Sequence, residues 1–124
     1  MADKIRLMIV DDSAIIRHTI EKHLKDFNIE ITASAADGAA ALESFKETNP
    51  DYVTLDITMP EMDGLTVLEE MLKLKPSVKV MIVTALSDKA TGLRAIELGA
   101  KSFVPKPFTP ERLREAFEKL IKLS

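Results

Sequence analysis

The sequence predicts an α/β fold, a three-layer α/β/α sandwich in which five parallel strands alternate with five helices. Two periodicities alternate along the chain: short apolar or β-branched runs, and segments whose apolar residues recur at helical spacing. The runs 7–10 and 80–83 are continuously apolar, as expected for central strands covered on both faces. Right-handed crossovers between parallel strands then place helices on both sides of one sheet.

Each expected strand is a short run of apolar or β-branched residues. The five runs cover 5–10, 29–35, 52–57, 79–84 and 102–105. The segment that follows each run has a helical pattern, so the order is a strand and then a helix, five times over.

The first two helices have clear start and stop signals. Ser13 can cap the first helix, and Asp37 can cap the second. The second helix must end before Pro50, because the residue before a proline disfavours the helical conformation. The apolar stripe of the first helix consists of Ile16, Ile20, Leu24 and Phe27.

The remaining three helices are delimited in the same way. The third begins at about Gly64 and ends before Pro76, and the fourth begins at residue 87 or 88 and ends at Gly99, a suitable C′ residue. The fifth has Thr109 as its N-cap and Pro110 at its first position. The apolar residues of these helices are Leu65, Leu68 and Leu72, then Leu93 and Ile96, then Leu113, Phe117, Leu120 and Ile121.

Composition narrows the class of protein. The 124 residues are expected to form one domain, 1–124, without an appended effector domain. The chain has no cysteine, so it has neither disulfides nor thiolate metal sites. A net charge of -3 with both signs interspersed gives no support to nucleic-acid binding. The first apolar run is too short for a signal peptide or membrane span, so we expect a cytoplasmic protein without membrane contact.

Five polar residues end four different apolar runs: Asp11, Asp12, Asp56, Thr84 and Lys106. Because the carboxyl ends of parallel strands open on one edge of the sheet, these side chains are expected to converge. Three carboxylates in one crevice are costly unless a divalent cation neutralises them, and their oxygens suit Mg²⁺. The chemistry that fits is phosphoryl transfer onto an aspartate.

Four ordered motifs carry a resemblance to a known family. They are the runs 10–13 (VDDS), 56–64 (DITMPEMDG), 84–85 (TA) and 106–108 (KPF). Together they resemble the motifs of response-regulator receiver domains over the whole chain, and the single-domain, CheY-like chemotaxis type most closely. The resemblance implies a flavodoxin-like sheet of order 2-1-3-4-5.

The resemblance also assigns roles to site residues. It implies that Asp56 accepts a phosphoryl group from a sensor histidine kinase or a phosphotransfer protein. It assigns Asp11, Asp12, Asp56 and the backbone carbonyl of Thr58 to a Mg²⁺ site in which Mn²⁺ can substitute. Lys106, the Thr84 hydroxyl and the neighbouring Ala85 would bind the phosphoryl group, and the peptide bond between Lys106 and Pro107 would be cis.

A phosphorylation switch follows from the same resemblance. Thr84 and Phe103 would move together and alter the face formed by the fourth helix, the fifth strand and the fifth helix, which would bind a downstream target, as in chemotaxis. The alternative is that Phe103 is simply a core residue of a short strand. Gly92 lies midway along the fourth helix and costs about 1 kcal/mol relative to alanine. We therefore expect Gly92→Ala to slow amide exchange in that helix.

Two other classes of function fit these residues less well. A phosphatase of the haloacid-dehalogenase type would need an acidic residue two positions after the nucleophile, where this chain has Thr58. A phosphorylation-independent interaction module is expected to have lost one of the five polar residues. The protein is therefore expected to be a signalling phosphoacceptor that catalyses only its own phosphorylation and dephosphorylation, either a monomer or a phosphorylation-dependent dimer.

The two histidines, His18 and His23, are five residues apart and lack metal-site spacing, so surface or half-buried positions are expected.

Overall fold

The computed structural model of the chain describes residues 4–59, 63–85, 87 and 89–123. Within these residues a five-stranded parallel sheet has the order β2-β1-β3-β4-β5, which confirms the expected fold class and strand order. The strands are β1 (Ile5–Val10), β2 (Ile29–Ala35), β3 (Tyr52–Leu55), β4 (Lys79–Ala85) and β5 (Ser102–Lys106). The helices are α1 (Ala14–Leu24), α2 (Gly38–Thr48), α3 (Gly64–Leu74), α4 (Lys89–Leu98) and α5 (Pro110–Ile121).

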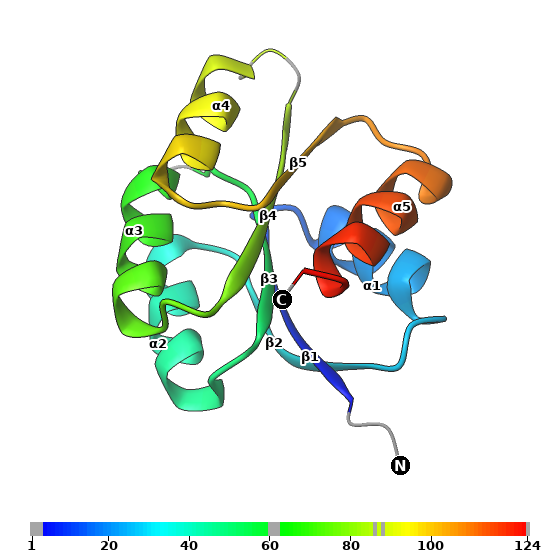
Figure 1. Ribbon diagram of the computed structural model, residues 1–124, viewed down its shortest axis with the longest axis horizontal. Helices are drawn as coiled ribbons and strands as arrows, with labels where there is room; N and C mark the ends of the chain where they lie inside the picture. The colour runs from blue at the N-terminus through cyan, green and yellow to red at the C-terminus, as the bar shows by residue number, and fades with distance from the viewer. Residues whose placement is uncertain (1–3, 60–62, 86, 88, 124) are drawn as a thin grey trace.

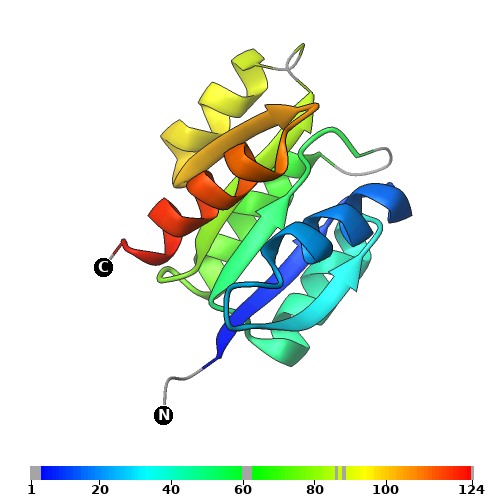
Figure 2. The same cartoon turned by 90° about the vertical axis from the view of Figure 1, so that its right-hand side faces the viewer.

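The helices cover both faces of the sheet. Helices α1 and α5 lie on one face, and α2, α3 and α4 lie on the other (Figures 1 and 2). In β1, Leu7 and Ile9 belong to the core under α1 and α5, whereas Met8 and Val10 belong to the core under the other three helices. This alternation explains the continuous apolar run, because both sides of the strand are buried.

Strand ends differ slightly from the sequence-based expectation. Strand β3 stops at Leu55, not at residue 57, because the Asp56 carboxylate accepts a hydrogen bond from the backbone N–H of Thr58 and turns the chain. Strands β4 and β5 each run one residue further than expected, and Ala85 pairs with Lys106. Pro105 is tolerated inside β5 because β5 is an edge strand.

The predicted N-caps are confirmed. The side chains of Ser13, Asp37 and Thr109 each accept a hydrogen bond from a backbone N–H in the first turn of α1, α2 and α5. At the end of α4, Gly99 has a φ of 126°, and the N–H of Ala100 donates to the carbonyl of Ala95. These contacts form a Schellman-type end, which places glycine where other residues would be strained.

Two sequence-based expectations about helix faces are wrong. Helical spacing predicts Leu93 and Ile96 on the apolar face of α4, but these side chains are 55% and 38% exposed, and the buried residues are Gly92 and Ala95. Helix α1 ends at Leu24, so Phe27 lies beyond the helix.

None of the described helices is long and apolar enough to cross a bilayer.

Candidate functional site

Four strands deliver the predicted polar residues to one edge of the sheet. Asp11 follows β1, Asp56 follows β3, Thr84 is the penultimate residue of β4, and Lys106 ends β5. Hydrogen bonds join all four side chains, although Asp11 and Lys106 are 95 positions apart in sequence. The convergence expected from the parallel topology is therefore present.

Lys106 connects two buried carboxylates. Its Nζ donates to Asp11 Oδ2 at 2.7 Å and to Asp56 Oδ2 at 3.1 Å. The side chains of Asp11 and Asp56 are only 1% and 4% exposed, so this ammonium compensates charges that water scarcely reaches. The peptide bond between Lys106 and Pro107 is cis, as the receiver resemblance implies.

The second oxygen of Asp56 has a different environment. Asp56 Oδ1 accepts hydrogen bonds from the Thr58 N–H at 2.9 Å, the Thr58 hydroxyl at 2.7 Å and the Thr84 hydroxyl at 3.2 Å. The hydroxyls of Thr58 and Thr84 are themselves 3.2 Å apart. The sequence-based prediction gave a role only to the backbone carbonyl of Thr58 and missed its hydroxyl. The missed signal is a hydroxyl residue two positions after an aspartate, where short side-chain to backbone turns form.

The three charged groups have shifted ionisation. Burial opposes ionisation of Asp56, but the backbone and side chain of Thr58 and the Lys106 ammonium hold its pKa below the usual value. Burial raises the pKa of Asp11, the Asp56 charge adds to that rise, and Lys106 and Ser13 only partly offset it. Burial would lower the pKa of Lys106, but its hydrogen bonds to Asp11 and Asp56 raise it. The cluster therefore favours an ionised Asp56 beside a protonated Lys106.

The carboxylates are close enough to hold a metal ion. One oxygen from each of Asp11, Asp12 and Asp56 lies within 4.8 Å of the others. Asp12 is exposed while the other two are buried, so the group is open to solvent on one side. An all-oxygen donor set with an open side fits a hard divalent cation that retains water. The assignment of the Thr58 carbonyl to this site remains a prediction.

The turn from β1 into α1 is fixed by contacts to Asp11. The N–H of Ser13 donates to Asp11 Oδ1 at 2.9 Å, and Arg17 Nη1 donates to the Asp11 backbone carbonyl at 2.7 Å. Arg17 is not among the residues predicted from the sequence. An arginine on the first helix gives no sequence signal of this role, because its partner is a backbone atom six residues earlier.

The remaining predicted residues lie on β4, β5 and α1. Ala85 is half-buried at the end of β4, and Phe103 is half-buried on β5. His18 is exposed and His23 is half-buried, as expected, and the His23 ring packs edge-on to Phe108 with 6.4 Å between centroids. Residues 60–62 of the 56–64 motif and residue 88, one of the two expected starts of the fourth helix, fall outside the described residues. The other expected start, residue 87, lies before α4, which begins at Lys89.

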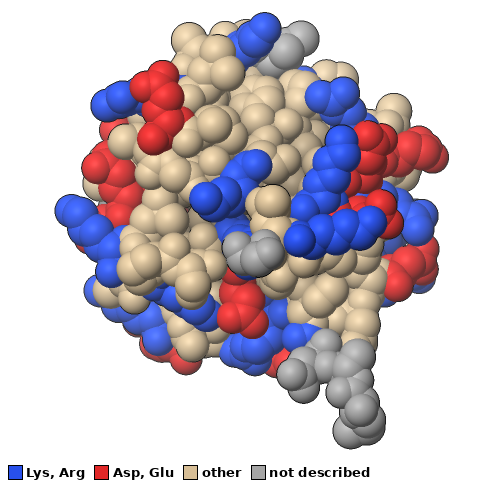
Figure 3. Space-filling view, in the orientation of Figure 1, with Lys and Arg blue, Asp and Glu red and all other residues tan. Residues whose placement is uncertain are grey.

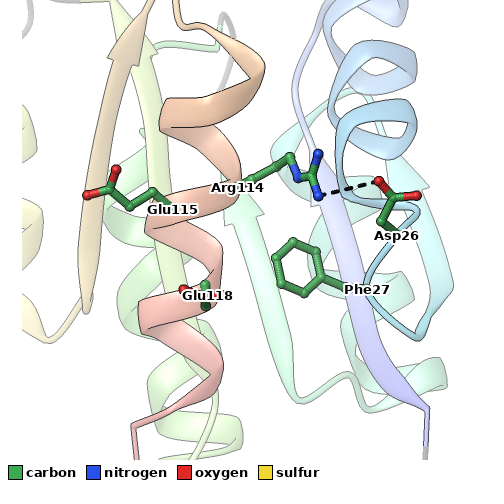
Figure 4. Close-up of a pocket in the computed structure, with 5 residues that line it drawn as sticks. All are labelled: Asp26, Phe27, Arg114, Glu115 and Glu118. Carbon is green, nitrogen blue, oxygen red and sulfur yellow. Dashed lines mark ion pairs between the residues drawn. The ribbon is translucent and has the colours of Figure 1, made fainter.

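A separate hollow of about 220 Å³ lies between the end of α1 and α5. An ion pair of 3.4 Å joins Arg114 to Asp26 beside it, and the Phe27 ring lines it (Figure 4). Since α1 starts at the carboxyl edge of the sheet and ends at the amino edge, this hollow is remote from the carboxylate cluster.

Comparison with known proteins gives consistent matches. The family description "Response regulator receiver domain" matches residues 7–118. The chain is 40% identical to "Chemotaxis protein CheY" of Thermotoga maritima, covering 94% of this chain and 98% of that one. It is 43% identical to "Chemotaxis protein CheY" of Listeria monocytogenes, covering 95% and 99%. It is also 46% identical to part of a protein-glutamate methylesterase/protein-glutamine glutaminase of Xanthomonas oryzae, covering 83% of this chain but 29% of the relative.

Solved structures agree with the sequence matches. The receiver domain of NtrX from Brucella abortus superposes with a TM-score of 0.88 at 32% identity, covering 95% of this chain and 99% of that one. CheY in the CheX-CheY-BeF3-Mg+2 complex from Borrelia burgdorferi gives 0.87 at 30% identity, covering 95% and 90%. These matches favour neither a haloacid-dehalogenase-type phosphatase nor a phosphorylation-independent module. The chain belongs to the response regulator receiver domain family and is a phosphorylation-activated signalling switch.

Proposed function

We propose that Asp56 is the phosphoryl acceptor of this switch and that Asp11, Asp12 and Asp56 hold Mg²⁺ during transfer. The observation that carries this proposal is the bridge in which Lys106 Nζ donates to both Asp11 and Asp56, beside the Thr84 hydroxyl. A buried carboxylate held between a cation and a hydroxyl donor is prepared for a reaction that brings three more anionic oxygens to it.

The chemistry is a displacement at phosphorus. A carboxylate oxygen of Asp56 bonds to the phosphorus while the bond from phosphorus to the donor breaks, and the donor leaves with that electron pair. No general base is needed, because the depressed pKa keeps Asp56 ionised. When bound, Mg²⁺ supplies positive charge that offsets the carboxylates and the phosphoryl oxygens. Lys106 can then pair with a phosphoryl oxygen as a point charge.

The response of the protein starts at Thr84. Its hydroxyl donates to Asp56 in the structure, and a phosphoryl group on Asp56 offers it a more highly charged acceptor. We propose that Thr84 follows the phosphoryl oxygens, that Ala85 moves with it, and that Phe103 repositions in response. The face formed by α4, β5 and α5 then changes its affinity for a target.

The partners follow from the relatives and from this face. The relatives named "Chemotaxis protein CheY" match this chain over almost their whole length, which supports a role in chemotaxis. The phosphoryl donor would be a sensor histidine kinase or a phosphotransfer protein. Figure 3 shows basic side chains over the middle of the α4–β5–α5 face, next to a broad uncharged area, which suits a protein target. A cytoplasmic location, the absence of further enzyme activity and a monomeric or phosphorylation-dependent dimeric state remain predictions.

Intact-mass measurement after incubation with a small phosphodonor and Mg²⁺ tests the acceptor. We expect wild type to gain the mass of one phosphoryl group and Asp56→Asn to gain none. Asp51→Asn is the matched control, because Asp51 directly precedes β3 whereas Asp56 directly follows it, and Asp51 pairs with Lys75 on the surface. This control should gain the same mass as wild type.

Equal gain in wild type and Asp56→Asn would reject Asp56 as the acceptor. Repeating the reaction with a chelator, with Mg²⁺ and with Mn²⁺ tests the metal. Transfer that is unaffected by the chelator would reject the metal assignment.

A further inference from the structure

A close approach joins the middle of α4 to β5. The Phe103 ring lies directly against the backbone of Gly92, so that a Cβ built on Gly92 would lie 1.7 Å from Cε2 and 2.2 Å from Cδ2 of that ring. Real side chains do not approach this closely, so residue 92 can have no side chain while the ring keeps its place. Gly92 is buried, and Phe103 is half-buried.

The Phe103 ring explains why residue 92 is a glycine. Gly92 lies inside α4 and has no positive φ, so its backbone does not need the conformational freedom of glycine. A glycine inside a helix is less favourable than alanine. The three atoms nearest to a Cβ placed on Gly92 all belong to the Phe103 ring, which means that this ring defines the space that the missing side chain leaves.

The ring has room to move in other directions. One hollow of about 260 Å³ is lined by Lys89, Leu93, Phe103, Pro105 and Arg112. Another of about 230 Å³ also has Phe103 in its wall, together with Ser102 and residues of α5. The ring therefore has open space beside it, whereas on the Gly92 side the backbone of α4 blocks its movement.

The contact between Gly92 and the Phe103 ring is close to the proposed switch. Phe103 pairs with Ile82 on β4, and Pro105 pairs with Thr84, so the side chains of Phe103 and Thr84 belong to the same side of the sheet. Ile82 and Phe103 also belong to the core on the α4 side. A shift of Thr84 toward a phosphoryl group therefore changes the space on the face of the sheet where the ring lies.

We propose that Gly92 is a positioning residue of the switch: its bare backbone is a seat for the Phe103 ring, and release of the ring from this seat couples Thr84 movement to α4. This inference rests on the proposed roles of Asp56, Thr84 and Phe103 and adds the element on which the ring acts. It also reverses the sequence-based expectation for Gly92→Ala, because a methyl group at residue 92 would displace the ring and loosen α4, so amide exchange there should become faster.

A four-variant thermal unfolding cycle tests the seat without phosphorylation. Gly92→Ala should lower the melting temperature when residue 103 is phenylalanine. In a Phe103→Val background, whose side chain is too short to reach the seat, Gly92→Ala should raise the melting temperature through helix propensity. Phe103→Ala serves as a second background if Phe103→Val does not fold. A change of the same sign and size in both backgrounds would overturn the seat.

Nuclear Overhauser contacts between the Gly92 Hα protons and the Phe103 ring protons test the coupling. We expect strong contacts in wild type and their loss when beryllofluoride, a phosphoryl mimic, saturates the protein with Mg²⁺. Asp56→Asn should keep the contacts under the same conditions. A merely structural glycine would not respond to the mimic.

The possible results separate the two proposals. If the amides around Asp56 report saturation by beryllofluoride while the contacts persist, the coupling is wrong and the acceptor assignment stands. If Asp56→Asn loses the contacts as wild type does, the coupling does not start at Asp56 and is overturned. If the mass experiment shows that Asp56 is not the acceptor, the proposed function fails, and the thermal cycle still decides whether the seat exists.

Discussion

Helices α4 and α5 flank the same edge strand, β5, but attach to the sheet in opposite ways. Helix α5 buries three large side chains completely or almost completely, Leu113, Phe117 and Leu120. Helix α4 fully buries only Gly92 and Ala95, while Leu93 and Ile96 are exposed and Leu98 is half-buried against the core. One helix is held by a stripe of large buried side chains, and the other rests on the sheet through two small buried residues, the half-buried Leu98 and the Phe103 ring.

This difference separates a structural helix from one that can respond. Each fully buried large apolar side chain stabilises by roughly 1.5–3 kcal/mol, so the stripe of α5 resists displacement. Helix α4 has no such anchor within the described residues and can shift at lower cost. A conformational change that starts at Thr84 can therefore displace α4 on one side of β5 more easily than α5 on the other side.

The largest effect is expected in the α5 stripe. Phe117→Ala removes a fully buried ring that packs edge-on against Phe27 and Tyr52, at centroid distances of 5.1 and 6.0 Å. We expect a loss of about 3–5 kcal/mol in the free energy of unfolding, measured by urea denaturation. A loss below about 1 kcal/mol would contradict the assignment of α5 as the anchored helix.

Native-state hydrogen exchange compares the two helices directly. We expect amides in the second half of α4 to exchange at least tenfold faster than those around Leu113 and Phe117, which corresponds to about 1.4 kcal/mol less protection. Mass spectrometry of exchanged peptides measures this. Equal protection of both helices would show that the exposed apolar residues of α4 do not reflect weak attachment.

The start of α5 contributes a smaller amount. Thr109 accepts a hydrogen bond from the N–H of Arg112 at 3.1 Å as the N-cap. Thr109→Ala should cost about 1 kcal/mol of unfolding free energy, while Thr109→Ser should keep most of it. If both variants lose the same amount in chemical denaturation, the cap hydroxyl is not the cause.

The exposed ion pairs of α5 should matter less still. Glu115 pairs with Lys119 at 3.5 Å and Glu118 pairs with Lys122 at 3.7 Å, both at i,i+4 spacing. Glu118→Gln should lower the unfolding free energy by about 0.3–0.5 kcal/mol at low salt. The difference from wild type should disappear in denaturation curves at high salt, and a persistent difference would argue against a charge effect.

The smallest change is expected on the outer face of α4. Leu93 is 55% exposed, so Leu93→Ser should alter the unfolding free energy by no more than about 0.5 kcal/mol. Leu113→Ser in α5 is the matched control, because Leu113 is fully buried and its replacement should destabilise strongly. A large loss in Leu93→Ser would mean that Leu93 is part of the core after all.

Much of the candidate site was predictable because its residues are set by strand ends. Asp11, Asp56, Thr84 and Lys106 each end an apolar run, and parallel topology brings such ends together. The Thr58 hydroxyl and Arg17 were missed because their roles depend on where one carboxylate or one carbonyl points. Side-chain direction of that kind has no periodic signal in the sequence.

The sequence by itself determined the order of strands and helices along the chain, the caps of α1, α2 and α5, and the meeting of the polar residues at one edge of the sheet. These features depend on local periodicity and on the direction of parallel strands. Tertiary structure alone decided which face of α4 is buried. Helical periodicity favours Leu93 and Ile96, but the Phe103 ring on β5 fills the space beside Gly92, so the middle of α4 turns Gly92 and Ala95 toward the sheet and leaves Leu93 and Ile96 exposed. That choice depends on a contact between residues eleven positions apart in different elements, which no local pattern encodes.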